Sequence, residues 1–216
     1  YKLPIAKFKK IEIKHAIKHP NWKMGKKISV DSSTMMNKVF EIIEAKSIFN
    51  LPISKLKILI HPKSYLHAII TYKNGLSNMI VHDTDMKIPI FNSIYLNGNK
   101  ILNSRSLDLA KINNFKFKKV NSKHFNSINI LKLFKNIKYS LYETVLVSAN
   151  GELVGLFLKK KISFLDITKK LIMIMNLKEF KKMWRRSPKN FNEISKLNKY
   201  VRLKTQSLCV RSSRNA

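Results

Sequence analysis

The chain has 216 residues, of which 44% are hydrophobic, so it can bury a core and is not disordered throughout. Its formal net charge is +31, from 43 Lys and Arg against 12 Asp and Glu. Such a charge is typical of nucleic-acid-binding proteins, but only six of the basic residues are Arg, and the Lys residues are spread along the chain. Lys, Asn, Ile and Phe share A/T-rich codons, so a biased genome explains the charge, and a nucleic-acid partner is not favoured.

Cysteine usage and hydropathy exclude other classes of protein. A single cysteine, Cys209, can build neither a disulfide framework nor a thiolate zinc site, which fits a reducing compartment. No uninterrupted apolar run approaches the roughly 18 residues that a membrane span needs. The basic stretch 1–10 lacks the apolar centre of a secretory signal. We therefore expect no membrane partner.

The first part of the chain predicts a loop followed by a long helix. Residues 19–27 are a loop punctuated by Pro and Gly, and residues 28–30 are β-prone. A helical pattern of apolar residues follows over 33–48. Asp31 and Ser32 stand where N-cap side chains are expected.

The middle of the chain predicts short strands. Residues 56–60 are typical of a buried strand, and the turn Lys73-Asn74-Gly75 predicts a hairpin between strands over 65–72 and 76–81. We expect a helix over 88–96. The polar stretch 97–127 is typical of a linker, with a short strand near 115–120.

The last part predicts a small antiparallel helical bundle and a frayed tail over 204–216. We expect an α+β protein with three parts: a catalytic α/β portion with a small mixed sheet at 1–96, the linker at 97–127, and the helical bundle at 128–216. The bundle helices are predicted over 128–139, 142–160, 164–176 and 189–203.

The densest group of polar side chains lies at the start of the long helix. Asn37, Lys38 and Glu41 can converge on one edge of that helix, and Ser32 precedes it. A hydroxyl, an amide and an ammonium suit a phosphate monoester near a helix N-terminus. A carboxylate beside phosphate implies a cation such as Mg²⁺ or Mn²⁺. The plainer interpretation is a surface ion pair between Lys38 and Glu41, with Trp22 and Met24 as core anchors.

A family resemblance favours the phosphate-and-cation site over the plainer interpretation. The string HPNWKMGKKISVDSSTMMNK at 19–38 is similar to the signature of 1-deoxy-D-xylulose 5-phosphate reductoisomerases. The similarity continues through IEA at 43–45, HP-S--H at 61–67, D-DM---PI at 83–90, LDL at 107–109 and TVL--AN at 144–150. It covers nearly the whole chain and is strongest over 15–95.

The resemblance implies a role for each matching residue. The family isomerises 1-deoxy-D-xylulose 5-phosphate and reduces it with NADPH to 2-C-methyl-D-erythritol 4-phosphate, in the non-mevalonate isoprenoid pathway. Its catalytic ion is Mg²⁺ or Mn²⁺, with Co²⁺ as another candidate. By this resemblance, Ser32, Asn37 and Lys38 bind the substrate phosphate. Catalytic roles fall to the metal ligand Glu41 and the substrate contact His19, and the remaining substrate contacts are Trp22 and Met24 on a flap at 19–27, His61 and Met86.

The sequence also departs from the family pattern. Val39-Phe40 replaces the usual Gly-Leu, and Ser33 replaces an Ala. At 147–151 the expected Asn-Ala-Ala-Asn-Glu reads Val-Ser-Ala-Asn-Gly, which puts in doubt the contacts from the helical bundle to the active site. Residues 95–99 replace an aromatic-Pro-acidic stretch of the family.

The chain has no glycine-rich dinucleotide fingerprint and matches only one of the family's three metal carboxylates. We therefore expect the Rossmann domain, and with it cofactor binding, to lie upstream, and the isolated chain to be inactive. The resemblance further implies a homodimer in a bacterial cytoplasm or a plastid. Two alternatives stay open, namely a basic RNA- or ribosome-associated protein and a non-catalytic remnant of the enzyme.

Overall fold

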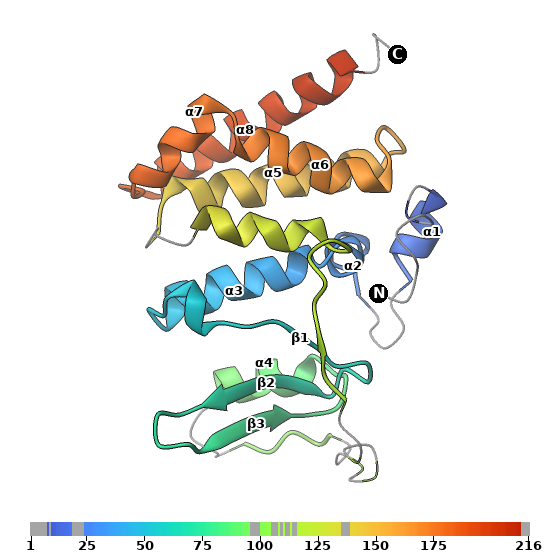
Figure 1. Cartoon of the computed structure of the whole chain (residues 1–216), viewed down its shortest axis with the longest axis vertical. Helices are drawn as coiled ribbons and strands as arrows, with labels where there is room; N and C mark the ends of the chain where they lie inside the picture. Colours follow the sequence, from blue (N-terminus) through green and yellow to red (C-terminus); the bar gives the residue numbers. More distant parts are fainter. Residues whose placement is uncertain are drawn as a thin grey trace. The chain divides into compact units, whose positions relative to one another are not determined.

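The computed structural model describes residues 8, 10–18, 24–95, 100–104, 108, 110, 113, 116–134 and 139–212. These residues form two compact units, whose elements are labelled in Figure 1. Of the described residues, the first unit combines those up to 57 with those from 121 onward, and the second unit comprises those between 58 and 120. The units cut across the expected boundaries at 96 and 127, since residues 24–57 pack with the C-terminal helices. The division into catalytic portion, linker and bundle stays a prediction.

The first unit begins with the helices α1 (Ile13–Ala16), α2 (Lys26–Ser33) and α3 (Met36–Ile48). The prediction of β structure at 28–30 is wrong, because these residues lie inside α2. Val30 is completely buried there, and α2 packs against both α3 and α5 (Leu141–Leu158). This packing outweighs the weak β preference of the local sequence.

A corner separates α2 from α3. Met35 has a left-handed backbone with φ of 62° and is the N-cap residue of α3. The predicted helix is thus confirmed over 36–48, but the prediction of its start at 33 is wrong. Asp31 and Ser32 lie inside α2, so neither caps α3. The side chain of Asp31 is instead buried and hydrogen-bonded to Lys27 and Asn150.

The helical bundle makes up the rest of the first unit. In Figure 1 its long helices α5, α6 and α8 lie side by side, and α5 packs against the other two. The segments of the bundle are the 3₁₀ helix η4 (Asn126–Phe134), α5, α6 (Phe164–Met175), the short α7 (Lys178–Lys181), the 3₁₀ helix η5 (Lys182–Arg185) and α8 (Phe191–Ser212).

Three of the four predicted bundle helices are confirmed, at 142–160, 164–176 and 189–203. The fourth, at 128–139, is a 3₁₀ segment that ends at Phe134, and residues 135–138 lie outside the described part. The prediction of a frayed tail is wrong as far as Ser212, because α8 continues to that residue. Val201 and Thr205 are completely buried and anchor this part of α8 in the bundle.

Local sequence signals fix where α5 and α6 begin. Ser140 and Glu143 form a reciprocal capping box at the start of α5, and Ser163 and Asp166 form another at the start of α6. Among the described helices, only α5 is long and apolar enough to span a bilayer, and 61% of it is buried inside the unit. Such burial is typical of a core helix.

The second unit consists of two small sheets and one helix. Strand β1 (Leu59–Ile60) pairs antiparallel with β4 (Lys118–Lys119). Strands β2 (Leu66–Thr71) and β3 (Ser77–Val81) form an antiparallel hairpin, and α4 (Lys87–Ile94) follows. Gly75 has φ of 89° in the hairpin turn, a conformation that favours glycine.

The α+β class and the predicted hairpin are confirmed. The strand predicted over 56–60 is reduced to β1, and the strand near 115–120 to β4. The helix predicted over 88–96 is present as α4. The described strands form two antiparallel pairs and not the single mixed sheet that we expected.

Candidate functional site

The predicted site residues fall into three groups. His19 and Trp22 lie outside the described residues. Five others belong to the first unit: Met24 just before α2, Ser32 on the last turn of α2, and Asn37, Lys38 and Glu41 on α3. His61 and Met86 belong to the second unit. The structure therefore brings four of the polar site residues onto two consecutive helices and the corner between them.

Lys38 and Glu41 form an ion pair on α3. The Lys38 Nζ lies 2.7 Å from Glu41 Oε2 and 2.9 Å from Oε1. Their side chains are 37% and 52% exposed, so both can exchange this contact for one with a ligand. The surface ion pair expected between Lys38 and Glu41 is therefore present. The same pair keeps an ammonium and a carboxylate together at the surface.

Asn37 and Lys38 are the second and third residues of α3. The first backbone N–H groups of a helix have no intrahelical partner, and the helix dipole favours an anion there. The side-chain Oδ1 of Asn37 is buried without a hydrogen-bond partner among the described residues. Asn37 as a whole is half-buried, and turning its amide over would exchange the positions of this oxygen and the NH₂ donor.

Ser32 contributes from the other side of the corner. The prediction that it stands at the start of the long helix is wrong, because it occupies the last turn of α2. Its carbonyl oxygen accepts a hydrogen bond from Met35 N–H at 3.2 Å. Ser32 is therefore tied to the corner, four residues before α3 begins at Met36.

Glu41 is the candidate metal ligand. Among the described residues no group of three His, Cys, Asp or Glu side chains could hold a metal ion. A half-exposed carboxylate fits one oxygen position of a Mg²⁺ or Mn²⁺ ion. The described residues thus fit such an ion in part, with its remaining ligands coming from elsewhere.

Sequence reasoning missed how the corner is held. The Oδ1 of Asp31 accepts a hydrogen bond from Asn150 Nδ2 on α5 at 2.8 Å, and its Oδ2 accepts one from Lys27 Nζ at 2.8 Å. The hydroxyl of Ser127 on η4 donates to the Thr34 carbonyl at 2.5 Å. The motif ending in Asn150 was the only available signal for this link between bundle and site helices.

Gly151 lies against a side chain of α8. The guanidinium group of Arg202 on α8 packs over this glycine, and a Cβ atom at 151 would lie 3.3 Å from Arg202 Nη2. Arg202 also lies 3.5 Å from Glu152 and bonds Asn198 at 2.8 Å. Asn150, which matches the family pattern, contacts Asp31. The effect of the departures at 147 and 151 on the site stays a prediction.

The second unit contributes a histidine-rich region. The ring of His61 is half-buried, 5.9 Å from that of Phe117, and Met86 is 53% exposed at the N-cap of α4. The rings of His67 and His82 stack at 3.6 Å. His61 and Met86 belong to the second unit and the other described site residues to the first, so the roles expected of His61 and Met86 stay predictions.

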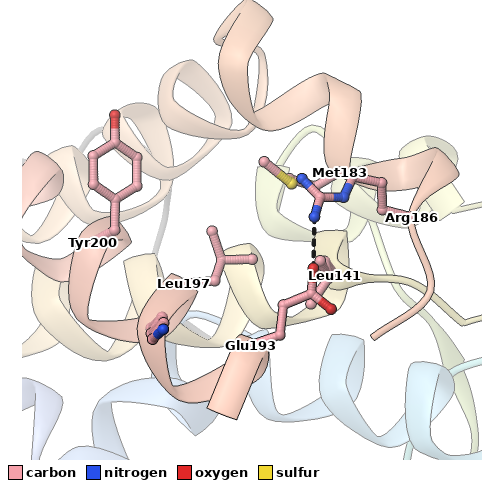
Figure 2. Close-up of a pocket in the computed structure, with 7 residues that line it drawn as sticks. Leu141, Met183, Arg186, Glu193, Leu197 and Tyr200 are labelled. Atoms are coloured by element: carbon pink, nitrogen blue, oxygen red, sulfur yellow. Dashed lines mark hydrogen bonds and ion pairs between the residues drawn. The ribbon is translucent and has the colours of Figure 1, made fainter. Parts of the chain in front are cut away.

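An open pocket of about 250 Å³ lies between α5, η5 and α8 (Figure 2). It contains none of the predicted site residues. Arg186 on one side bonds Glu193 on the other at 2.6 Å. A hydrogen bond from the Lys189 backbone N–H, together with Arg186, lowers the pKa of the Glu193 carboxyl. These two charges neutralise each other, so we assign no chemistry to this pocket.

Comparison with known proteins identifies the chain. The family model "1-deoxy-D-xylulose 5-phosphate reductoisomerase C-terminal domain" matches residues 1–49, and the model "DXP reductoisomerase C-terminal domain" matches residues 82–204, more than half of the chain. Both models describe C-terminal domains of reductoisomerases. The chain belongs to the 1-deoxy-D-xylulose 5-phosphate reductoisomerase family.

Individual relatives agree. The curated reductoisomerase of Pelagibacter ubique is 56% identical over 208 residues, which are 96% of this chain and 53% of that protein. The Aquifex aeolicus protein of the same name is 38% identical over 163 residues, covering 76% of this chain and 43% of the relative. The chain thus spans about half the length of the curated relatives it matches.

Solved structures show the same fold. The Zymomonas mobilis reductoisomerase in complex with NADPH has a TM-score of 0.83 and 27% identity, covering 96% of this chain and 52% of that one. A structure of DOX-P reductoisomerase with NADPH, fosmidomycin and magnesium has a TM-score of 0.87 at 27% identity, with the same coverage. The predicted family is confirmed, and the RNA-binding alternative is not favoured.

Proposed function

We propose that this chain is the substrate-phosphate half of an NADPH-dependent 1-deoxy-D-xylulose 5-phosphate reductoisomerase. The whole enzyme would isomerise and reduce that substrate to 2-C-methyl-D-erythritol 4-phosphate. The observation that carries the proposal is the α2–α3 corner. The four candidate site residues lie there within one stretch of ten residues that resembles the family pattern, namely Ser32, Asn37, Lys38 and Glu41. The 56% identity to a reductoisomerase over 96% of the chain supports it.

Phosphate binding is the task of the corner residues. Lys38 would supply the full positive charge, while Ser32 and Asn37 supply neutral donors. The free N–H groups of the first turn of α3 point in the direction that favours an anion. When the phosphate arrives, Lys38 exchanges its ion pair with Glu41 for one with the ligand, which releases the carboxylate of Glu41.

Glu41 would hold one position of a divalent ion, Mg²⁺ or Mn²⁺, with Co²⁺ as a further candidate. Such an ion, when bound, polarises hydroxyl and carbonyl oxygens of the substrate. The magnesium in a solved relative supports the choice of Mg²⁺. Glu41 lies one helical turn from Asn37, so phosphate and ion would be held by the same rigid helix.

NADPH would be bound by a domain outside these 216 residues, which have no glycine-rich fingerprint. NADPH in solved relatives supports this cofactor. The flap predicted at 19–27, whose last two residues are in α2 and not in a loop, carries His19, Trp22 and Met24 and would close over the substrate and exclude water. We further propose a homodimer located in a bacterial cytoplasm or a plastid.

The test is an assay of the full gene product for NADPH oxidation with 1-deoxy-D-xylulose 5-phosphate and Mg²⁺ or Mn²⁺. Glu41→Gln should abolish metal-dependent turnover. Lys38→Met removes a charge-assisted hydrogen bond and should lower kcat/KM by about 10- to 100-fold, mainly through KM. Lys169→Met on α6, an exposed lysine away from the corner, is the control and should change neither constant. Absence of turnover in the unsubstituted protein would refute the proposed activity.

A further inference from the structure

We propose that Asn150 and Asp31 form a positioning pair for the phosphate site. They set the angle of the α2–α3 corner from inside the helical bundle, without touching the substrate. The inference rests on the proposed function, because it assigns the corner to phosphate binding. The proposed role of the pair is to hold Ser32 and α3 in one geometry, which the site residues themselves do not do.

The corner itself is a weak point of the chain. α2 ends at Ser33, Met35 adopts a left-handed backbone with φ of 62°, and α3 begins at Met36. A non-glycine residue in this conformation is held by its surroundings. Within the corner, the Thr34 hydroxyl lies 3.1 Å from both the Val30 and the Asp31 carbonyl oxygens. These local bonds do not fix the direction in which α3 leaves.

Two long-range hydrogen bonds hold the end of α2 that leads into the corner. Asp31 precedes Ser32 and is bonded by Asn150 of α5, while Thr34 precedes Met35 and is bonded by Ser127 of η4. Asn150 is completely buried, Asp31 is 4% exposed and Ser127 is 1% exposed. Both tethers therefore act on residues just before Met35, and both come from the bundle.

The chemistry of the pair indicates a purpose other than stability. Asn150 Oδ1 is buried without a partner among the described residues, and burial of such a group is unfavourable. Asp31 is a buried carboxylate, and the side chain of its ion-pair partner Lys27 is half-exposed. Apolar residues of similar size would join α2 to α5 at lower cost. A carboxylate that accepts and an amide that donates instead define one relative placement of the two helices.

That placement matters because phosphate recognition is geometric. Ser32 stands before the corner and Asn37 and Lys38 stand after it, so a small rotation of α3 separates their donors. A displacement of about 1 Å is enough to weaken a convergent site strongly. Loss of the pair should thus weaken binding of phosphate itself, in addition to any effect on folding.

The experiment uses the full gene product and measures the dissociation constant of inorganic phosphate by calorimetry, together with KM, kcat and Tm. Asn150→Asp places a second carboxylate against Asp31 and should weaken phosphate binding by about tenfold and raise KM similarly, with kcat changed less. The exchanged variant Asp31→Asn/Asn150→Asp restores one donor and one acceptor and should recover most of the binding. A double variant Asp31→Leu/Asn150→Leu should keep or raise Tm and still bind phosphate weakly.

Unchanged phosphate binding in the double leucine variant would overturn the inference. If that variant does not fold, failure of the exchanged variant to recover binding while its Tm recovers would overturn it equally. Lys38→Met separates this result from the proposed function. If Lys38→Met binds phosphate normally, the proposed phosphate site is wrong. If Lys38→Met weakens binding and the Asn150 variants do not, only the positioning role fails.

Discussion

The two units of this chain differ in how they bury apolar surface. Among the described residues, every buried apolar side chain belongs to the first unit, including Phe134, Leu153 and Ile167. In the second unit no described residue is buried, and the hairpin exposes large apolar side chains on both of its strands. The first unit therefore has a core within this chain, whereas the second is held by local hydrogen bonding and turn geometry.

This difference predicts different stabilities. A two-stranded hairpin is at best marginally stable unless a further surface packs against it. The exposed side chains of Ile69 and Met79 lie on one face of the hairpin, and those of Ile70 and Ile80 lie on the other. We thus expect the second unit to open at lower free energy than the first. The substitutions below test this contrast.

The largest effect should come from truncating the core of the first unit. Phe134→Ala removes a completely buried ring and should lower the free energy of unfolding by about 3–5 kcal/mol. Ile80→Ala removes a side chain that is 48% exposed and should change it by less than about 0.5 kcal/mol. Urea unfolding followed by far-ultraviolet circular dichroism measures both. Equal losses in the two variants would contradict the contrast.

A buried ion pair inside the first unit should come next. Lys46 on α3 lies 2.9 Å from Glu143 at the start of α5, and both side chains are largely buried. Lys46→Met leaves the carboxylate without its cation and should cost about 3 kcal/mol. The exposed Lys38 is the comparison, and Lys38→Met should cost less than about 1 kcal/mol. The same urea experiment applies, and a recovery in Lys46→Met/Glu143→Gln would identify the unpaired charge as the cause.

Tyr142 should give a smaller and pH-dependent effect. Its hydroxyl donates to the Met175 carbonyl at 2.6 Å, and burial raises the pKa of Tyr142 to about 12. Tyr142→Phe should cost about 1 kcal/mol at neutral pH. Above about pH 10 the unfolded chain loses this proton first, so the contribution of Tyr142 is lost as pH rises toward 12. Unfolding at several alkaline pH values should therefore show the gap between the two proteins narrowing, and a constant gap would count against it.

The smallest effects compare two glycines. Gly75 has open space around it but a φ of 89°, so Gly75→Ala should destabilise the hairpin by about 1 kcal/mol. Gly155 in α5 also has open space, and Gly155→Ala should stabilise the first unit by about 0.5 kcal/mol. Hydrogen exchange resolves the two units separately. Faster exchange in α5 of Gly75→Ala would show that the units are not independent.

Much of the fold follows from local signals. The Asn74-Gly75 turn and the capping residues Ser140 and Ser163 determine where elements begin or reverse, and each acts within a few residues. Prediction failed where contacts distant in sequence decide. Val30 lies in a helix because the bundle buries it, and Thr205 continues α8 because its side chain is buried.

The sequence predicted candidate site residues but not their arrangement. The family resemblance pointed to Ser32, Asn37, Lys38 and Glu41, and the ion pair of Lys38 with Glu41 follows from helical spacing. The corner at Met35 contains no glycine, so no turn residue in the sequence indicates it. Its tether to Asn150 joins residues 119 positions apart, and no periodicity in the sequence can reveal such a contact.

The long reach of these tethers has a consequence for synthesis. The bond from Ser127 to Thr34 spans 93 residues, and the bond from Asn150 to Asp31 spans 119. The corner therefore leaves the ribosome well before its partners exist, and contacts of such separation close late because the chain entropy of the loop must be overcome first. We expect the corner to be among the last parts of the first unit to become ordered. A growing chain that has not reached Asn150 carries every residue of the proposed phosphate site on the first unit, yet lacks the geometry that makes them a site.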